Sequence, residues 1–405
     1  MKFGTLAAVA AAVVSTATVL GTAQAKDLKI GLIAPFTGQQ AQYGTQFKRA
    51  IDLYMKEHGD TVAGRKVQVI IRDDGGINPA TAKRDAQQLL VQDKVDILAG
   101  FGFTPNAFSV APLATQFKVP MIVMNAATSS ITEKSPYILR TSMTMQQSAA
   151  AMAQYAYEHG TKSAYVLVAD YAPGVDWQGE FTKQFTSLGG KVVGDVRAPV
   201  NTVDYAPYLE RIANAKPSAA AMFVPGGQPG LALIKSIENS NLKKANVEPI
   251  GAGDLTDETV LQSYGDGAVG YITAFHYSEA HVSPENKAFV EGFKKAYPGQ
   301  SADFVAVGGW DGINLIYKVL EKTRGDASGD AFIAAAKGMK WESPRGPVEI
   351  DPQTRDIIQN EYIRKVEKVD GQLQNTEFFV YKAVKDPGKT PGNKFEFSGS
   401  GPVTP

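Results

Sequence analysis

The chain has 405 residues, of which 44% are hydrophobic and 20% are charged, a balance typical of soluble globular proteins. Its 41 Lys and Arg residues equal its 41 Asp and Glu residues, which argues against nucleic acid or an anionic membrane surface as the main partner. The absence of cysteine excludes disulfide bonds and a lipid-modified cysteine. The length is sufficient for two domains.

The N-terminus has the pattern of a secretory signal peptide. Lys2 precedes an apolar run rich in alanine and valine, and Ala23-Gln24-Ala25 offers a small-residue cleavage site. The run is too short for a membrane span, and an N-terminal core helix is the competing interpretation. We therefore expect a signal peptide over residues 1–25 and a mature chain that begins at Lys26. The mature chain would work in a bacterial periplasm without a lipid anchor.

Short apolar runs alternate with segments of helical period along the mature chain. Strands are expected at Leu28–Ala34, Val67–Arg72, Val95–Ala99, Pro120–Met124, Ala164–Ala169, Lys191–Val196, Ala219–Val224, Pro249–Ala252 and Gly270–Phe275. Between them, helical faces are expected from Tyr43, Phe47, Ala50, Ile51, Tyr54 and Met55, from Ala82, Ala86, Leu89 and Leu90, and from Val175, Phe181, Phe185 and Leu188. This alternation predicts an α/β fold of two doubly wound, Rossmann-like lobes.

The chain is expected to leave the first lobe near Ile138–Met143 and to cross back near Thr273–His276. From Pro284 the sequence is helical, and it then becomes strand-like at Pro347–Ile350, Tyr362–Val366 and Phe378–Tyr381. The tail, residues 386–405, is rich in Gly, Pro and Ser and is expected to be irregular.

Ligands of open α/β sheets bind beyond the carboxyl ends of the strands, so the loops after the predicted strands are the candidate site. Each is rich in Gly, Ser, Thr or Asn: Pro35–Gly44, Gly100–Asn106, Asn125–Ser130, Asp170–Gly174, Pro225–Gly230 and Gly253–Glu258. Such residues also serve as ordinary helix caps and turns. Six such loops in one chain favour a small-molecule cleft.

Motifs for catalysis, cofactors and metals are not found. The chain has no Gly-x-Ser-x-Gly or His-Glu-x-x-His, and Gly388-Lys389-Thr390 lacks the first glycine of a phosphate loop. The spacing of His276, Glu279 and His281 fits no common metal site. We therefore expect binding rather than catalysis, with no cofactor and no metal.

Several segments resemble one family. IGLIAPFTGQQAQYG, GFGFTPN, VPMIVMNAATSS, DYAPG and SPRGPVEIDPQTRD are similar to segments of the periplasmic solute-binding proteins of ABC importers. The family is the leucine/isoleucine/valine-binding, class I type. The resemblance implies two lobes joined by three hinge crossings, a ligand enclosed between them, a membrane permease as partner and no enzymatic activity. With these crossings, lobe 1 would comprise residues 27–141 and 276–352, and lobe 2 residues 142–275 and 353–385. A monomer is expected.

The resemblance also implies a set of binding residues. Phe103 and Thr104 fall where the family binds the ligand carboxylate, and Asp254 falls where its carboxylate binds the ligand ammonium. Thr128 is expected to hold the carboxylate together with Thr104. The full set is Tyr43, Phe103, Thr104, Asn125, Ala127, Thr128, Tyr171, Gly226, Asp254 and Trp310.

Two departures from the family pattern bear on the ligand. The usual serine cluster is replaced by Phe-Thr-Pro-Asn at 103–106, and Gly226-Gly227 suggests extra room. The expected ligand is a branched-chain or related amino acid, because Asp254 matches the ammonium site. The alternatives are a benzoate- or cinnamate-like aromatic carboxylate, a ligand-binding sensor that reports to a membrane receptor, and a secreted enzyme on the same scaffold.

Overall fold

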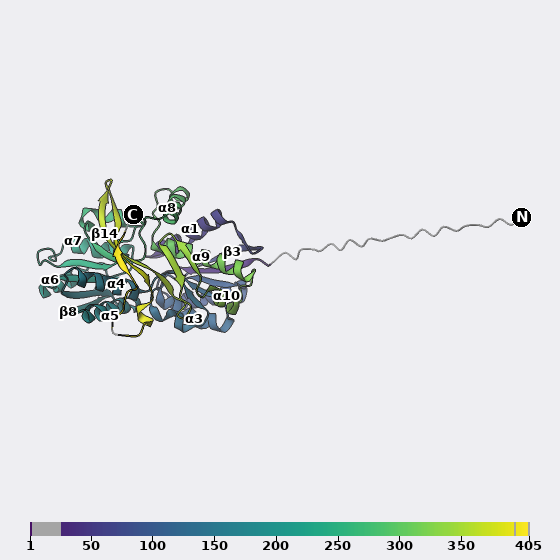
Figure 1. The fold of residues 1–405 in the computed structure, drawn as a ribbon, viewed down its shortest axis with the longest axis horizontal. Helices are drawn as coiled ribbons and strands as arrows, with labels where there is room; N and C mark the ends of the chain where they lie inside the picture. The colour runs from purple at the N-terminus through teal and green to yellow at the C-terminus, as the bar shows by residue number, and fades with distance from the viewer. Residues whose placement is uncertain (2–25, 393, 404–405) are drawn as a thin grey trace.

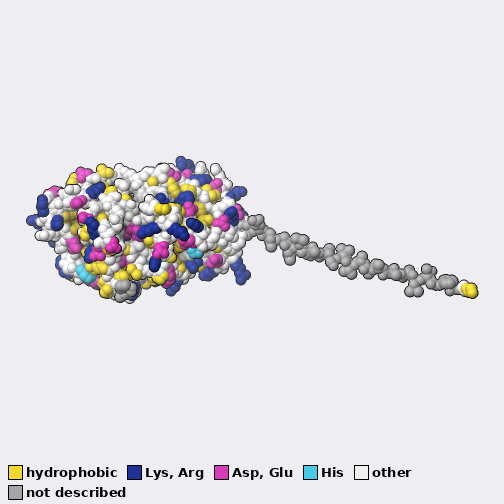
Figure 2. Space-filling view, turned by 90° about the horizontal axis from the view of Figure 1, so that it is seen from above, with side chains coloured by type: hydrophobic (Ala, Val, Ile, Leu, Met, Phe, Trp, Pro, Cys, Tyr) yellow, Lys and Arg dark blue, Asp and Glu magenta, His cyan; other side chains and the backbone are white. Residues whose placement is uncertain are grey.

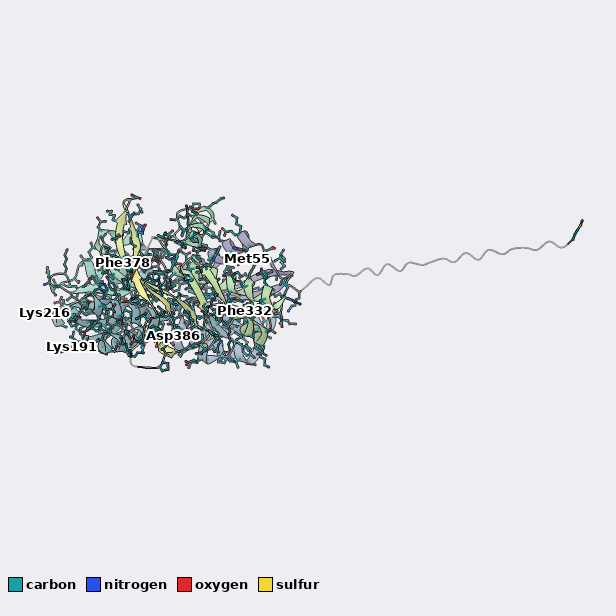
Figure 3. All side chains as sticks on the ribbon, in the orientation of Figure 1. Met55, Lys191, Lys216, Phe332, Phe378 and Asp386 are labelled. Atoms are coloured by element: carbon teal, nitrogen blue, oxygen red, sulfur yellow. The ribbon has the colours of Figure 1, made fainter. Side chains whose placement is uncertain are left out.

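The structure, a computed structural model, describes Met1 and residues 26–392 and 394–403. The expected signal peptide therefore lies, apart from Met1, outside the described residues. The described chain forms two α/β lobes that lie side by side (Figure 1), each built on its own sheet. Met55 and Phe332 belong to lobe 1, whereas Lys191 and Lys216 belong to lobe 2 at the other end of the molecule (Figure 3).

Lobe 1 contains a six-stranded sheet in the order β2-β3-β1-β4-β5-β6. All neighbouring strands are parallel except β2 and β3. Strand β1 is a nearly continuous buried apolar run, as central strands of parallel sheets require. The elements are β1 (Leu28–Ala34), α1 (Ala41–His58), β2 (Thr61–Val62), β3 (Arg65–Asp73), α2 (Pro79–Gln88), η1 (Leu89–Asp93), β4 (Ile97–Gly100), α3 (Thr104–Phe117), β5 (Met121–Val123), η2 (Ser129–Lys134), β6 (Ile138–Arg140), α8 (Pro284–Ala296), α9 (Phe304–Thr323) and α10 (Gly329–Ala336).

Lobe 2 contains a sheet whose main path is β12-β13-β14-β11-β10-β9-β7-β8; in addition, β15 pairs with β14 and β16 pairs with β15. Helix α4 begins with a capping box between Thr144 and Gln147, which fixes its start. The elements are α4 (Met145–Glu158), β7 (Ser163–Ala169), α5 (Ala172–Ser187), β8 (Lys191–Ala198), α6 (Ala206–Ala215), β9 (Ala219–Phe223), α7 (Gln228–Glu238), β10 (Glu248–Ala252), η3 (Gly253–Thr256), η4 (Leu261–Ala268), β11 (Ile272–Phe275), β12 (Lys340–Ser343), β13 (Gly346–Ile350), β14 (Ile357–Val369), β15 (Gln372–Val384), η5 (Pro387–Lys389) and β16 (Ser400–Pro402).

The chain passes between the lobes after β6, after β11 and over the segment from β12 to β14, whose strands pair with one another. The first and third crossings are joined by a hydrogen bond from the Arg140 N–H to the Arg355 carbonyl, at 3.1 Å, and by the buried ion pair of Arg140 and Asp356. Residues 340–350 were expected in lobe 1. They form β12 and β13, which pair through β13 with β14, while Trp341 donates to Asp311 of α9.

The prediction of an irregular tail is wrong in part. Strand β16 pairs with β15, and the side chain of Phe395 is buried. The amide of Gln184 in α5 donates to the Phe395 carbonyl and accepts from its N–H, at 2.9 and 2.7 Å. Asp386, labelled in Figure 3 between the lobes, accepts hydrogen bonds from Ser129 of lobe 1 and Thr144 of lobe 2. Tail residues thus find partners far away in the sequence.

The surface shows charges of both signs intermixed over the face in Figure 2, consistent with the equal numbers of acidic and basic residues. Within the described part of the chain, no helix has the length and apolarity needed to cross a membrane. One expected core position is wrong, because Val175 on α5 is 39% exposed. The buried face of that helix instead carries Trp177, Phe181 and Phe185.

Candidate ligand-binding site

An enclosed cavity lies between the lobes, at the carboxyl ends of their parallel strands. Lobe 1 contributes residues that follow β1, β4 and β5, and lobe 2 contributes residues at or after the ends of β7, β9 and β10. The cavity leaves only about 20 Å³ of open space, far below the range of about 300–1,000 Å³ for ligand pockets, so its walls lie close together in this state. The lining residues are Tyr43, Gly102, Phe103, Thr104, Asn125, Ala126, Ala127, Met143, Met145, Tyr171, Pro173, Phe223 and Asp254.

Two pairs of stacked aromatic rings line the cavity, one from each lobe. In lobe 1, the rings of Tyr43 and Phe103 have centroids 5.6 Å apart and planes at 26°. In lobe 2, the rings of Tyr171 and Phe223 are 6.0 Å apart and at 13°. Because four aromatic rings line the cavity, its walls are largely apolar and suit a ligand with an apolar body.

The start of α3 forms the part of the cavity that favours an anion. Phe103 precedes the helix, and Thr104 is its first residue, so the first backbone N–H groups of α3 have no partner within the helix. The Thr104 hydroxyl donates to the Thr128 hydroxyl at 3.1 Å and accepts from the Thr128 N–H at 3.4 Å. This pair of threonines ties the start of α3 to the loop that follows β5.

Arg140 binds the backbone of the loop that follows β5. Its guanidinium donates to the carbonyls of Ala126 and Thr128 and pairs with Asp356 at 2.9 Å. The Arg140 side chain is fully buried, and its five donors suit simultaneous contact with several oxygens. Arg140 therefore fixes the loop backbone and places a positive charge behind the anion-favouring part of the cavity.

Asp254 is the charged residue that lines the cavity, and it comes from lobe 2. Its side chain is 4% exposed, and its Oδ2 atom has no hydrogen-bond partner among the described residues. Burial raises the pKa of Asp254 to about 7, with a further upward contribution from Asp257 and a downward one from Arg364. A carboxyl group in this state can be neutral or charged near neutral pH, so it can donate or accept a hydrogen bond.

Gly226 and Gly227 do not enlarge the cavity, which corrects the interpretation that they provide extra room. A Cβ atom on Gly227 would lie 2.2 Å from the Gln42 Nε2 atom of lobe 1, and one on Gly226 would lie 3.4 Å from the ring of Phe304. The two glycines therefore let lobe 2 approach lobe 1 closely. The structure represents the closed state, with the cavity enclosed.

Most of the residues expected at the site meet in this cavity, and three do not line it. Thr128 lies behind Thr104, and Gly226 lies at the contact between the lobes. Trp310 packs elsewhere in lobe 1, with its ring centroid 4.9 Å from that of Tyr54 and 5.0 Å from that of Phe289. The residues expected at the site that line the cavity are Tyr43, Phe103, Thr104, Asn125, Ala127, Tyr171 and Asp254.

Sequence reasoning missed some lining residues. Met143 lies in the first hinge crossing, which was interpreted as a connection, and Met145 is the first residue of α4. Phe223 is the last residue of β9 rather than part of the loop after it. Gly102, Ala126 and Pro173 lie in loops that were expected to form the site, although they were not singled out as binding residues. A Cβ atom on Gly102 would lie 3.1 Å from Pro35 and 3.4 Å from Tyr43, so a larger residue there would require these neighbours to shift.

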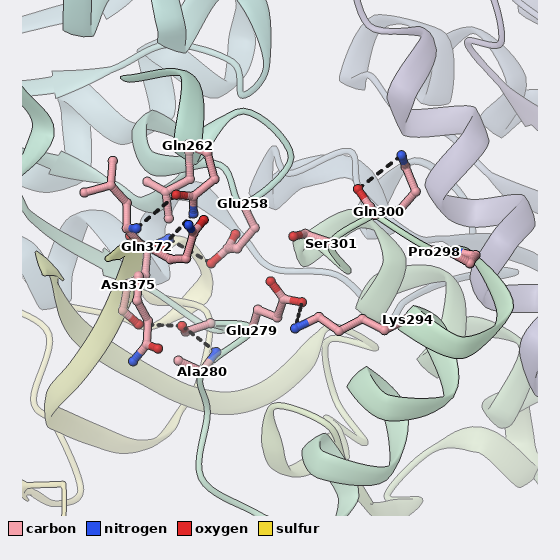
Figure 4. A pocket seen from close by; sticks show the side chains of 15 residues that line it. Glu258, Gln262, Glu279, Ala280, Lys294, Pro298, Gln300, Ser301, Gln372 and Asn375 are labelled. Atoms are coloured by element: carbon pink, nitrogen blue, oxygen red, sulfur yellow. Dashed lines mark hydrogen bonds and ion pairs between the residues drawn. The ribbon is translucent and has the colours of Figure 1, made fainter. Parts of the chain in front are cut away.

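A second, wider opening lies between the lobes, with a volume of about 620 Å³. It is bordered by α8 and the loop after it in lobe 1 and by the β14–β15 hairpin in lobe 2. Lys294 and Glu279, which both line this opening, form an ion pair with a Nζ–Oε1 distance of 3.1 Å (Figure 4). Its lining is largely polar and lacks aromatic rings. Among the described residues, no group of three or more His, Cys, Asp or Glu side chains could hold a metal ion. The enclosed aromatic cavity is therefore the candidate site.

Comparisons with known proteins agree with this architecture. Residues 27–372 match the model of the family described as periplasmic binding protein. The Leu/Ile/Val-binding protein homolog 6 of Brucella melitensis biotype 1 is 44% identical over 369 residues, which cover 90% of this chain and 94% of that protein.

Solved structures are similar over nearly the whole chain. A solute binding protein of an ABC transporter from Rhodopseudomonas palustris BisB5, in complex with 3,4-dihydroxy benzoic acid, is 54% identical with a TM-score of 0.87, over 90% of this chain and 99% of that chain. One from Rhodopseudomonas palustris HaA2, in complex with p-hydroxybenzoic acid, is 45% identical with a TM-score of 0.87, over the same shares. The implied resemblance is thus confirmed, and the chain belongs to the periplasmic binding protein family, whose members are solute-binding proteins of ABC transporters rather than enzymes.

Proposed function

We propose that this protein is the periplasmic binding component of an ABC importer and that it captures a small aromatic carboxylate between its lobes. The ligand ring lies between the two aromatic pairs, and the ligand carboxylate lies at the start of α3, near Thr104. The closed protein then delivers the ligand to a membrane permease. Both walls of the cavity come from one chain, so a monomer is sufficient to bind the ligand.

The observation that carries this proposal is the presence of aromatic rings on both walls of the cavity. Tyr43 and Phe103 line it from lobe 1, and Tyr171 and Phe223 line it from lobe 2. Aromatic surfaces stack on one another in an offset or edge-on manner with centroids about 4.5–7 Å apart. Relatives at 54% and 45% identity, which bind dihydroxybenzoic and hydroxybenzoic acid, support the same ligand class.

A branched-chain amino acid is the second candidate. The 44% identical Brucella protein is named as a homolog of Leu/Ile/Val-binding proteins, and Asp254 offers a carboxylate for a ligand ammonium. The aliphatic side chain of such a ligand would contact the same apolar walls, but it would leave the flat faces of four rings poorly matched.

A thermal-shift panel separates the two candidates. A ligand at about 100 times its dissociation constant stabilises a protein by roughly 2.7 kcal/mol. We expect benzoate, 4-hydroxybenzoate or 3,4-dihydroxybenzoate to raise the melting temperature and leucine, isoleucine and valine to leave it unchanged. Stabilisation by the amino acids alone would replace the proposed ligand class with the second candidate.

The role in transport is distinguished from a role in sensing by the proteins encoded nearby. A permease and an ATPase encoded beside the gene would support import. A neighbouring histidine kinase would instead favour a sensor that uses the same closure.

A further inference from the structure

The cavity contains unpartnered hydrogen-bond acceptors in addition to its anion-favouring part. The Asp254 Oδ2 atom and the Asn125 Oδ1 atom are both buried without a partner among the described residues. The Asn125 amide group is oriented by its own hydrogen bond to the Gly102 carbonyl, at 2.9 Å, which directs the Oδ1 atom away from that bond. A buried polar group without a partner costs about 1–3 kcal/mol.

These two acceptors set a requirement on the ligand. A carboxylate offers only acceptors, so it cannot satisfy Asn125 or an ionised Asp254. Unsubstituted benzoate has no other polar group and would leave both atoms unpaired. A ring hydroxyl both donates and accepts, so it satisfies Asp254 whether that carboxyl is neutral or ionised.

We propose that Asp254 selects aromatic acids that carry a ring hydroxyl group, by forming a hydrogen bond with that hydroxyl while the ligand carboxylate lies at the start of α3 on the opposite lobe. This inference rests on the proposed function and specifies its ligand class. Asp254 belongs to η3 of lobe 2 and Thr104 to α3 of lobe 1, so the two polar groups of the ligand contact different lobes. The hydroxyl thereby contributes to closure as well as to selectivity.

The neighbouring acidic residues Asp257 and Glu258 are not placed to bind the ligand hydroxyl. Asp257 caps the turn that follows it by accepting from the N–H and hydroxyl of Thr259, both at 2.8 Å. Glu258 accepts from Asn375 at 2.9 Å and pairs with Arg364. Neither residue lines the cavity, whereas Asp254 does.

The test compares ligands of similar shape on matched variants. Dissociation constants for 4-hydroxybenzoate and 4-methylbenzoate are measured by calorimetry, because the methyl group has a similar size to the hydroxyl and cannot form its hydrogen bond. We expect the wild-type protein to prefer the hydroxy acid by about 10- to 100-fold. Asp254→Val should reduce this ratio to near one, and Asp254→Asn, whose amide can donate and accept, should retain most of it.

Glu258→Gln is the control variant. It alters a buried carboxyl four residues away whose pKa is also raised to about 7, and it should leave the ratio unchanged. Asp254→Ala serves the same test as Asp254→Val should the latter fail to fold.

The outcomes separate this inference from the proposed function. If both aromatic acids bind with equal affinity to the wild-type protein, or if the valine variant keeps the preference, the role of Asp254 is overturned while the ligand class stands. If neither aromatic acid binds and leucine does, the proposed function fails and the hydroxyl inference fails with it.

Discussion

At the scale of single residues, burial changes the pKa of Asp254, and this change could not be predicted from the sequence. An exposed aspartate is ionised above about pH 4, and an ionised Asp254 would repel a ligand carboxylate inside the same enclosed cavity. Removal from water raises the pKa of Asp254 to about 7. The neutral form is therefore accessible near neutral pH, and it is the form that tolerates an anionic ligand.

Ligand affinity should consequently depend on pH in a defined direction. Below pH 7 Asp254 is mostly protonated before the ligand binds. Above pH 7 it is mostly ionised, so binding of an anionic ligand beside neutral Asp254 requires uptake of a proton from solvent. We expect the affinity of the wild-type protein for an aromatic acid to fall by up to about tenfold between pH 6 and pH 8. Calorimetry at both pH values measures this change. Asp254→Asn should show almost none of it, and an equal pH dependence in both proteins would assign the titration to another group.

At the scale of elements, strands with continuous apolar runs were predictable from the sequence, and strands that depend on a partner were not. The run Leu28–Ala34 forms β1 with unchanged bounds. The edge elements β2, β12 and β16 are two to four residues long and are defined by pairing with distant strands. A short polar segment carries no periodic signal, so its partner decides its structure.

In the candidate site, too, some features could be predicted from the sequence and others depend on tertiary packing. Loops after parallel strands could be predicted to meet, because these strands end at one edge of the sheet. Rotation about a helix axis could not be predicted so well. Gly308 and Gly312 of α9 face Met124, whereas Trp310 lies between them in the sequence and packs on Tyr54, outside the cavity.

The ordered part of the tail should contribute to stability. The Phe395 ring is 6% exposed and packs 5.0 Å from the ring of Phe397. Removing a buried phenylalanine side chain costs about 3 kcal/mol or more. We expect Phe395→Ala to lower the free energy of unfolding by about this amount in urea titrations. Glu396→Ala, at the exposed neighbouring position, should change it by less than about 0.5 kcal/mol, and equal effects would mean that the tail does not pack as described.

At the scale of the whole molecule, closure buries two carboxyl groups near each other. Asp257 of lobe 2 and Asp303 of lobe 1 are both fully buried in the closed state. The oxygen atoms Asp257 Oδ2 and Asp303 Oδ2 have no partner among the described residues. Burial and the proximity of Asp257 raise the pKa of Asp303. The closed state therefore carries an electrostatic cost that opening relieves, and a ligand that contacts both lobes offsets it.

Small-angle scattering should show whether the ligand shifts the protein from the open to the closed state. Without ligand, the wild-type protein should have a larger radius of gyration than with a saturating aromatic acid, and a compound that gives no thermal shift should leave the radius unchanged. Asp303→Asn replaces one of the two buried carboxyl groups with a neutral amide and can still accept the hydrogen bond from the Ala306 N–H that caps α9, at 2.8 Å in the wild type. That variant should be more compact without ligand and should bind the ligand more tightly, because less free energy is needed for closure.

An identical radius with and without saturating ligand in the wild-type protein would rule out closure as the binding mechanism. A radius of the variant equal to that of the unliganded wild type would show that the Asp257–Asp303 pair does not oppose closure.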